Sequence, residues 1–553
     1  MSELIIAVDR ARQRVEPHAR RQWAAFFQYA PHALVVFIAC LGVYFFKELD
    51  FLVGDQRLTH GALLFLLVVS TVSVRASQVA LPLRVVHRTV FLLFAAYAVA
   101  AYPAVSDAYI YESAYSELLW LHGRWLAVVA AAIAWFRPGF GIIPVVIVAW
   151  KKHLMAEQFG FPLNATDYYP VAELGLYLSF AIALAPAAET LLSRFASKHD
   201  LIDRARATSW SVGEAAFLGA FAIHIANYFY SAVAKITLPG AGPLTWVLEN
   251  QTHYIMMATW VTGLGPLHSH DLLAIAGHEF MAHFQYLTNA MTVAVQLAAL
   301  VCIIRIRWAM ALTGIYDVTH AIIFVTTSIL FWKWMTLNVG LIIALHHLLP
   351  RKSPPTPLIV MTVAVTILAP IIFNIAALGW FDTAALNRPS VEAVTADGRH
   401  VPVPTTYFLE GSAQMAKTVI GRPFEGHFDE IGVFGKALRS YDIMQRANRC
   451  ELPTAEESGP SRSFAREPKL EKYFVEHHEY ILSHVDENGR FPYNIFPHHN
   501  WSNPALYQEF RSLDLRTIVA YRYIIDSLCL SYDGAGGVAE QTQLRGVHKI
   551  EVR

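Results

Sequence analysis

The sequence carries little charge for its length. Only 16% of its 553 residues are Asp, Glu, Lys or Arg, whereas a soluble globular protein usually carries about 25%. The 43 basic residues balance the 43 acidic ones, so the chain has no net positive charge that would attract phosphate groups. Together with 55% hydrophobic residues, this composition excludes a disordered protein and a nucleic-acid-binding protein.

Cysteine is also scarce. The four cysteines, Cys40, Cys302, Cys450 and Cys529, are too few for a disulfide-rich scaffold, and none of their spacings is typical of a zinc finger. Cys40 and Cys302 fall in apolar runs, where a thiol packs as a small hydrophobic side chain. Cys450 and Cys529 fall in the polar C-terminal region, where a disulfide requires Cα atoms within about 7 Å. The sequence leaves both a bridge and two unpaired thiols open.

Long apolar runs are abundant instead. A bilayer-spanning helix needs about 20 mostly apolar residues. Runs that approach or reach this length occupy residues 30–46, 61–75, 85–102, 119–136, 139–150, 170–192, 213–236, 288–305, 308–330, 331–349 and 356–378. They predict a mostly α-helical, polytopic membrane protein with about nine to eleven transmembrane helices.

The arginines predict an orientation and, with composition, three domains. Residues 1–25 hold five arginines ahead of a late first apolar run, which argues against a cleavable signal peptide and for a basic cytoplasmic N-terminal segment. Residues 26–380 form the transmembrane domain, with a His-rich outer loop at 237–287. An odd number of crossings places residues 381–553 outside the cytoplasm. We expect them to form an α+β domain, because apolar and polar residues alternate around an Asp397-Gly398 turn.

The most informative polar residues lie at the end of the 213–236 run. His224, Tyr228 and Lys235 are spaced i, i+4 and i+11, so they share one face of a helix. Ionisable residues inside membrane helices usually face protein or a cavity and indicate a functional site. A buried lysine can act as a neutral general base near pH 7. The alternative is a lysine whose ammonium group reaches the membrane surface.

Two segments resemble the vitamin K-dependent γ-carboxylase family, whose membrane part is shared by bacterial members as the HTTM domain. Tyr228-Phe-Tyr-Ser-Ala-Val-Ala-Lys235-Ile resembles the end of a helix in that family. Tyr316-Asp317-Val-Thr-His320, followed by Phe331-Trp332-Lys333-Trp334, resembles its late His-containing helix and the aromatic continuation. Ala232 stands where the family usually has glycine, and the extramembrane domain is shorter than in the animal enzymes.

The resemblance implies a quinol-dependent carboxylase. In the family, a neutral lysine deprotonates a reduced quinone of the vitamin K hydroquinone type. O2 and CO2 are co-substrates, and the carboxyl acceptor is a glutamate side chain of a protein or peptide. Lys235 matches the basic lysine, and His224 and Tyr228 are the further catalytic residues predicted beside it. The predicted quinone-binding residues are Tyr230, His320, Trp332 and Lys333.

Two other functions remain open. His268, His270, His278, Glu279 and His283 lie in the outer loop, together with His253, and suggest a metal-dependent membrane oxidoreductase. However, His278 and His283 are spaced i, i+5 rather than the i, i+4 of a zinc-binding HExxH helix, so no metal is favoured. The third function is non-catalytic: a membrane protein that binds lipid or quinone.

Overall fold

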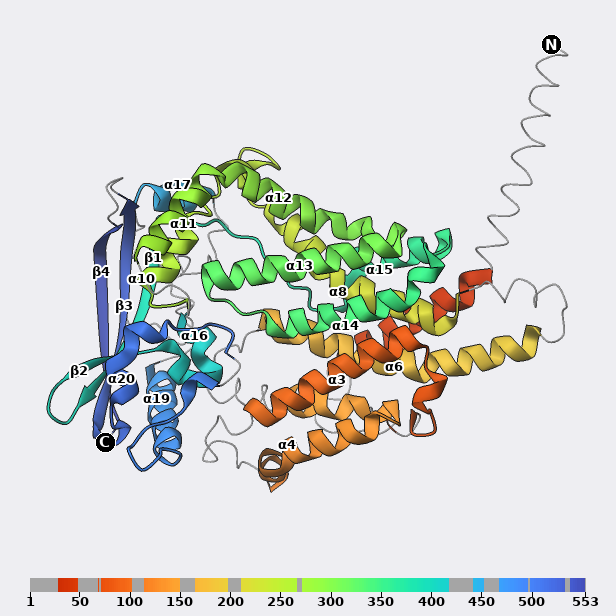
Figure 1. The fold of residues 1–553 in the computed structure, drawn as a ribbon, viewed down its shortest axis with the longest axis horizontal. Helices are drawn as coiled ribbons and strands as arrows, with labels where there is room; N and C mark the ends of the chain where they lie inside the picture. The colour runs from red at the N-terminus through yellow and green to blue at the C-terminus, as the bar shows by residue number, and fades with distance from the viewer. Residues whose placement is uncertain are drawn as a thin grey trace, which may run out of the picture.

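The computed structural model describes a helical bundle joined to a small sheet (Figure 1). The residues described are 28–47, 68, 71–101, 114–149, 165–196, 210–265, 271–416, 441–451, 467–495, 498–532 and 538–552. The basic N-terminal segment, most of the 61–75 run, and His268 and His270 lie outside these ranges.

Five described helices are long and apolar enough to cross a membrane, by length and composition, which agrees with the predicted mostly helical membrane protein. They span Gln28–Lys47, Leu81–Ala100, Pro170–Ser193, Val212–Ile236 and Ile306–Thr327. The last four lie in α3 (Leu81–Ala101), α6 (Ala165–Ala196), α8 (Val212–Ile236) and α13 (Ile306–Thr327). The predicted apolar runs match these elements closely, because a bilayer-spanning segment must satisfy its backbone hydrogen bonds internally as a helix.

Further helices complete the bundle. They are α4 (Ala114–Ala134), the apolar helix Pro138–Ala149, α12 (Gln285–Leu297), α14 (Trp332–Leu348) and α15 (Thr356–Ile372). The 288–305 run is not one continuous helix, because α12 gives way to 3₁₀ turns over residues 298–304. The 356–378 run is also divided: α15 ends at Ile372, and the chain continues without regular structure as far as Thr383.

One end of the bundle carries several arginines. Gly213, at the start of α8, lies against Ala80, directly before α3. Arg351, after α14, pairs with Glu214 at 3.2 Å. The starts of α3 and α8 and the end of α14 therefore meet at one end, which also carries Arg84 and Arg88 of α3. We call it the arginine end. Lys235 lies at the opposite end of α8.

The C-terminal region forms an antiparallel four-stranded sheet with helices on it, as the prediction of an α+β region requires. The strands are β1 (Ala385–Thr395), β2 (His400–Val403), β3 (Ile518–Tyr532) and β4 (Val538–Glu551), in the order β2-β1-β3-β4. The predicted hairpin is confirmed: Val391 pairs with Val403 across a turn in which Gly398 has a φ of +84°. The helices of this region and of the segments around it are α9 (Thr245–Glu249), α10 (Tyr254–Val261), α11 (Asp271–His283), α16 (Ser412–Ala416), α17 (Tyr441–Asn448), α19 (Glu467–Leu482) and α20 (Gln508–Ser512).

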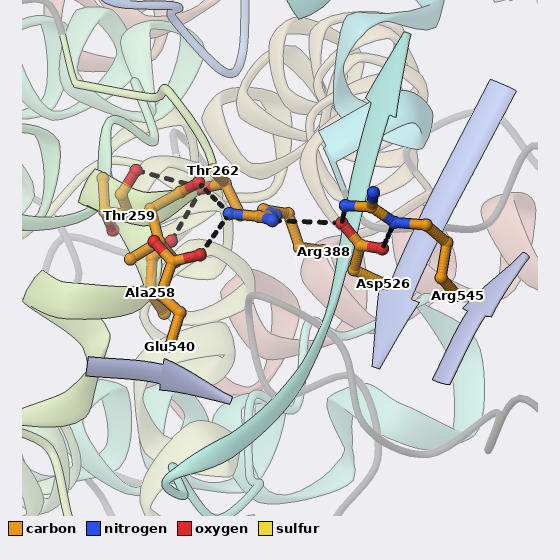
Figure 2. A network of polar contacts seen from close by, with 8 residues as sticks. Ala258, Thr259, Thr262, Arg388, Asp526, Glu540 and Arg545 are labelled. Atoms are coloured by element: carbon orange, nitrogen blue, oxygen red, sulfur yellow. Dashed lines mark hydrogen bonds and ion pairs between the residues drawn. The ribbon is translucent and has the colours of Figure 1, made fainter. Parts of the chain in front are cut away.

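A row of charged side chains crosses the sheet (Figure 2). Arg388, Asp526 and Arg545 stand directly opposite one another on β1, β3 and β4. Arg388 also pairs with Glu540 at 2.6 Å and donates to the carbonyl of Val261 in α10. This row ties the sheet to a helix beside the bundle.

Further contacts attach the C-terminal region to the bundle. Ile329, between α13 and α14, forms a β-bridge with Asn500, and Leu264 forms one with Ser502. A disulfide joins Cys450 and Cys529, whose Cα atoms are 5.7 Å apart. Of the two possibilities that the sequence left open, the structure thus has the bridge. Cys40 and Cys302 are buried and unpaired.

Candidate functional site

The last turns of α8 carry a row of polar side chains. Ser211 caps the start of the helix by accepting a hydrogen bond from Glu214 N, which satisfies one of the amides of the first turn. Near the other end, Asn227, Ser231 and Lys235 follow at intervals of four residues and therefore lie on one side of the helix. All three are buried.

This row binds the irregular segment that follows α15. Asn227 Oδ1 accepts a hydrogen bond from Ala376 N at 2.8 Å. The Ser231 hydroxyl donates to Ala376 O at 2.9 Å and accepts from Leu378 N at 3.2 Å. Lys235 Nζ donates to Leu378 O at 2.6 Å. The segment has no helix of its own to satisfy its backbone, so the α8 side chains supply the partners that a buried backbone needs.

Lys235 is enclosed by protein. Its side chain donates to Ser231 O at 3.2 Å and to Gln296 Oε1 of α12 at 3.3 Å, in addition to Leu378 O. Its Nζ lies 5.3 Å from the centre of the Trp246 ring. The residue is 9% exposed, so its ammonium group is covered by protein. Within the described part of the chain, all of its hydrogen-bond acceptors are neutral.

Asp382 is the carboxylate that acts on Lys235 electrostatically. It lies near the end of the irregular segment and accepts hydrogen bonds from Asn250 Nδ2 and Trp380 Nε1, both at 3.1 Å. Burial raises the pKa of the Asp382 carboxyl, although these two hydrogen bonds and Lys235 oppose that effect. The Trp380 carbonyl accepts a hydrogen bond from Trp246 Nε1 at 2.6 Å, which fixes the Trp246 ring beside Lys235.

A second polar cluster lies deeper in the bundle, where α8, α13 and α14 meet. Asn338 is fully buried and uses its whole amide group. Its Oδ1 lies 2.7 Å from His224 Nε2, and its Nδ2 donates to Tyr228 OH at 3.1 Å and to Asp317 Oδ1 at 2.8 Å. The Tyr228 ring stacks on Tyr316 with centroids 3.6 Å apart. The structure thus brings His224 and Tyr228 together.

The two clusters meet at α12. Tyr316 OH donates to the carbonyl of Val295 at 3.2 Å, and the next residue, Gln296, accepts from Lys235. Tyr228 and Lys235 share a face but are seven residues apart, which is about 10 Å along the helix axis. Lys235 therefore does not touch the other two predicted catalytic residues.

His320 extends the second cluster toward the C-terminal region. Its Nδ1 lies 4.0 Å from Asp317 Oδ1, and its ring packs against Phe331 with centroids 5.0 Å apart. Phe331 in turn packs against His499 at 5.3 Å. A continuous line of polar and aromatic side chains thus joins the bundle interior to the C-terminal region.

The other predicted quinone-binding residues lie elsewhere. Tyr230 is turned toward α15, where it donates to the carbonyl of Ile367. The Lys333 Nζ lies 5.1 Å from the ring centre of Tyr97 in α3 and 5.2 Å from that of Trp332. Trp332 packs against Tyr97 with centroids 5.6 Å apart. Of the four, His320 is the one whose contacts above join it to the His224 cluster.

The His-rich segment forms no metal site among the described residues. His278 is buried and its Nδ1 lies 3.2 Å from the carbonyl of His253, whereas His283 is exposed. Glu279 accepts a hydrogen bond from Tyr532 of β3. Burial lowers the pKa of His253 to about 4 and also lowers that of His278. These groups pack α10 and α11 against each other and against the sheet.

Sequence reasoning missed several residues of both clusters. Asn227 precedes Lys235 by two helical turns in an apolar run. This spacing of polar residues indicates that Asn227 lies on the same side of the helix as Lys235. Asn338 also stands in an apolar run, where a buried amide indicates a partner on another helix. Gln296 and Asp382 gave no comparable signal, because their proximity to Lys235 depends on how distant segments pack.

Comparison with known proteins gives no further assignment. The chain matches no family model, and no curated protein or solved structure is significantly similar to it. The candidate function therefore depends on the residues and geometry described above.

Proposed function

We propose that the protein is a quinol-dependent membrane carboxylase in which Lys235 is the general base. The supporting observation is the enclosure of Lys235 at the end of a membrane-length helix, where its hydrogen-bond acceptors among the described residues are all neutral. A lysine without a direct carboxylate partner can exchange a proton with a bound hydroxyl group. Enclosure also keeps bulk water away from a strong base.

The resemblance to γ-carboxylases supplies the reaction. Lys235 Nζ takes the hydroxyl proton of a reduced quinone, and O2 oxidises that co-substrate to its epoxide with release of water. The strong base generated in this oxidation removes the γ-proton of a glutamate side chain, whose carbanion adds CO2. In balance, one quinol, one O2, one CO2 and one glutamate give one epoxide, one water and one carboxylated glutamate.

The surrounding residues have distinct roles in this proposal. Gln296 and the carbonyl of Leu378 orient the lysine, and the Trp246 ring offers a flat apolar surface beside it. His320 is the best placed of the predicted quinone-binding residues, because it lies in the aromatic line that leads from Tyr228 toward the C-terminal region. His224 and Asn338 hold that line in place through their hydrogen bond.

An orientation is part of the proposal. The arginine end of the bundle faces the cytoplasm, as the positive-inside rule requires. Lys235, Asp382 and the C-terminal sheet then face the other side, and the carboxyl acceptor reaches the site from there. We also propose that the chain is a member of the γ-carboxylase family, that it crosses the membrane nine to eleven times, and that it uses a quinone.

The test is quinol epoxidation under O2, which needs no knowledge of the carboxyl acceptor. Lys235→Gln keeps a donor for Leu378 O but removes the titratable amine, and Lys235→Arg keeps the charge but cannot act as a base. Both variants should lose epoxidation while remaining folded. Lys47→Gln is the matched control, because Lys47 also lies in the bundle but pairs directly with Glu173 at 2.9 Å.

The outcome separates the base from a merely structural lysine. If Lys235 serves only to hold Leu378, Lys235→Gln retains epoxidation, and the base role is ruled out. Absence of epoxidation in the wild-type protein would instead favour a non-catalytic role in binding lipid or quinone. Metal analysis of the purified protein addresses the remaining alternative. Iron or zinc close to one equivalent would favour a metal-dependent oxidoreductase.

A further inference from the structure

Residues of α3 and α4 line an apolar groove, and these two helices lie at the edge of the bundle in Figure 1. The volume of the groove is about 470 Å³. The floor is made of small buried residues, Ala95 and Ala131. The walls are large exposed side chains, which include Leu92, Val99, Val128 and Trp135. Both helices belong to the membrane part of the chain, so an apolar chain is the natural occupant of this notch.

The groove ends beside basic residues. Arg88, one helical turn before Leu92, lies over the Trp135 ring at 3.8 Å and donates to the Trp135 carbonyl at 2.9 Å. Arg84 is one further turn back along α3, and Arg137 follows the end of α4. The groove thus leads from the interior of the bilayer to the arginine end.

These arginines have hydrogen-bonding capacity to spare. Arg84 and Arg137 each donate to one backbone carbonyl, Ala76 O and Ser73 O respectively. The Nε atoms of Arg84 and Arg88 are buried without a partner among the described residues. Residues 71–101 and 121–149 contain no Asp or Glu, and among the described residues no ion pair joins Arg84, Arg88 or Arg137 to a carboxylate. A guanidinium group binds phosphate through a fork of N–H donors.

We infer that this groove binds an anionic phospholipid, with one acyl chain between α3 and α4 and the phosphate at Arg88 and Arg84. The apolar lining alone accepts any lipid chain. The arginines without carboxylate partners select a head group with a net negative charge, because a zwitterionic head group brings its own cation. The site is separate from Lys235, which lies at the opposite end of the bundle.

The experiment measures how much lipid the detergent-purified full-length protein retains. Dioleoyl phosphatidylglycerol and dioleoyl phosphatidylcholine are compared by native mass spectrometry. We expect one phosphatidylglycerol to be retained in preference to phosphatidylcholine. Arg88→Gln should weaken this retention by about tenfold, the size of effect expected for one charge-assisted hydrogen bond. Arg307→Gln is its control, since Arg307 is exposed and lies on α13, away from the groove.

A second pair of variants tests the chain-binding part. Ala132→Phe places a large ring in the groove and should abolish retention of the phospholipid. Val129→Phe adds the same ring to the same helix at a position that is 55% exposed and outside the groove, and it should have no effect. Equal retention of the two lipids would overturn the inference. So would phosphatidylglycerol retention that neither Arg88→Gln nor Ala132→Phe reduces.

Discussion

At the scale of single residues, Asp526 shows how much one carboxylate can organise. It is only 1% exposed and accepts hydrogen bonds from Arg388 at 3.0 Å and from Arg545 at 2.6 Å. Burial opposes its ionisation, but these hydrogen bonds hold the pKa of the carboxyl below its ordinary value. The carboxylate pairs with an arginine on each neighbouring strand and so connects three strands of the sheet.

Replacing Asp526 by alanine should destabilise the C-terminal region strongly. The change leaves Arg388, 19% exposed, and Arg545 beside each other without the shared anion. Loss of one partner of a buried ion pair typically costs about 3–5 kcal/mol. Glu540→Ala, at a position that is 31% exposed, should cost less than about 1 kcal/mol. Urea unfolding of the two variants measures the difference, and equal effects would show that Asp526 does not hold the sheet together.

The stability of the folded protein should depend on pH through Glu476. Burial raises the pKa of its carboxyl from 4.5 to about 7, although Lys472 at 3.7 Å opposes this. The folded state thus binds a proton that the unfolded state has released between about pH 4.5 and pH 7, so stability falls as the pH rises through this window. Above about pH 7 the folded protein bears the full cost of burying the ionised carboxylate. Glu476→Gln should remove it.

The measurement is the apparent melting temperature of both proteins across this pH range. The two should agree near pH 4.5, and the variant should melt at a higher temperature at pH 8. Other groups titrate in both proteins, so the difference between the curves isolates Glu476. Parallel curves would mean that its carboxyl has an ordinary pKa.

At the scale of elements, the contact between α8 and the irregular segment after α15 can be tested through Ser231. Ser231→Ala removes the partner of both Ala376 O and Leu378 N with little change in volume. Each buried backbone group left without a partner costs about 1–3 kcal/mol. Amide hydrogen exchange over residues 374–382 should therefore accelerate. Ser179→Ala is the matched control, because the Ser179 hydroxyl bonds only to Gly175 O of its own helix. Unchanged exchange in Ser231→Ala would mean that the row does not hold the segment.

The same contact shows where sequence reasoning succeeds and where it ends. Hydropathy located α8 and α13 to within a few residues, because membrane-length helices require continuous apolar runs. It could not show that the 356–378 run stops being helical at Ile372, since Phe373 to Trp380 are mostly apolar in either conformation. Lys235 is identifiable as a candidate because it is an ionisable residue at the end of an apolar run, on the same helix face as His224 and Tyr228. Its partners Gln296 and Leu378 come from other segments, and only tertiary packing brings them to it.

At the scale of the whole molecule, the disulfide ties the C-terminal region together. Cys450 follows α17 and Cys529 lies in β3, and they are 79 residues apart in sequence. In the chain-entropy model, a bridge across a loop of this length contributes roughly 4 kcal/mol of stability. Such bonds persist in oxidising compartments and are rare in the cytosol. The bridge therefore agrees with the proposed orientation, in which the arginine end is cytoplasmic and the sheet lies on the other side.

A membrane-impermeant maleimide tests that orientation directly. On intact cells without reductant, no cysteine should react, because Cys40 and Cys302 are buried and the other two are joined. After mild reduction Cys450 should be labelled from outside the cells, and Cys529 more slowly because it is 3% exposed. The Cys450→Ser, Cys529→Ser double variant should remain unlabelled under both conditions. Labelling of reduced protein only after cell lysis would reverse the orientation and place Lys235 on the cytoplasmic side. The arginine end would then lie outside the cytoplasm, against the positive-inside rule.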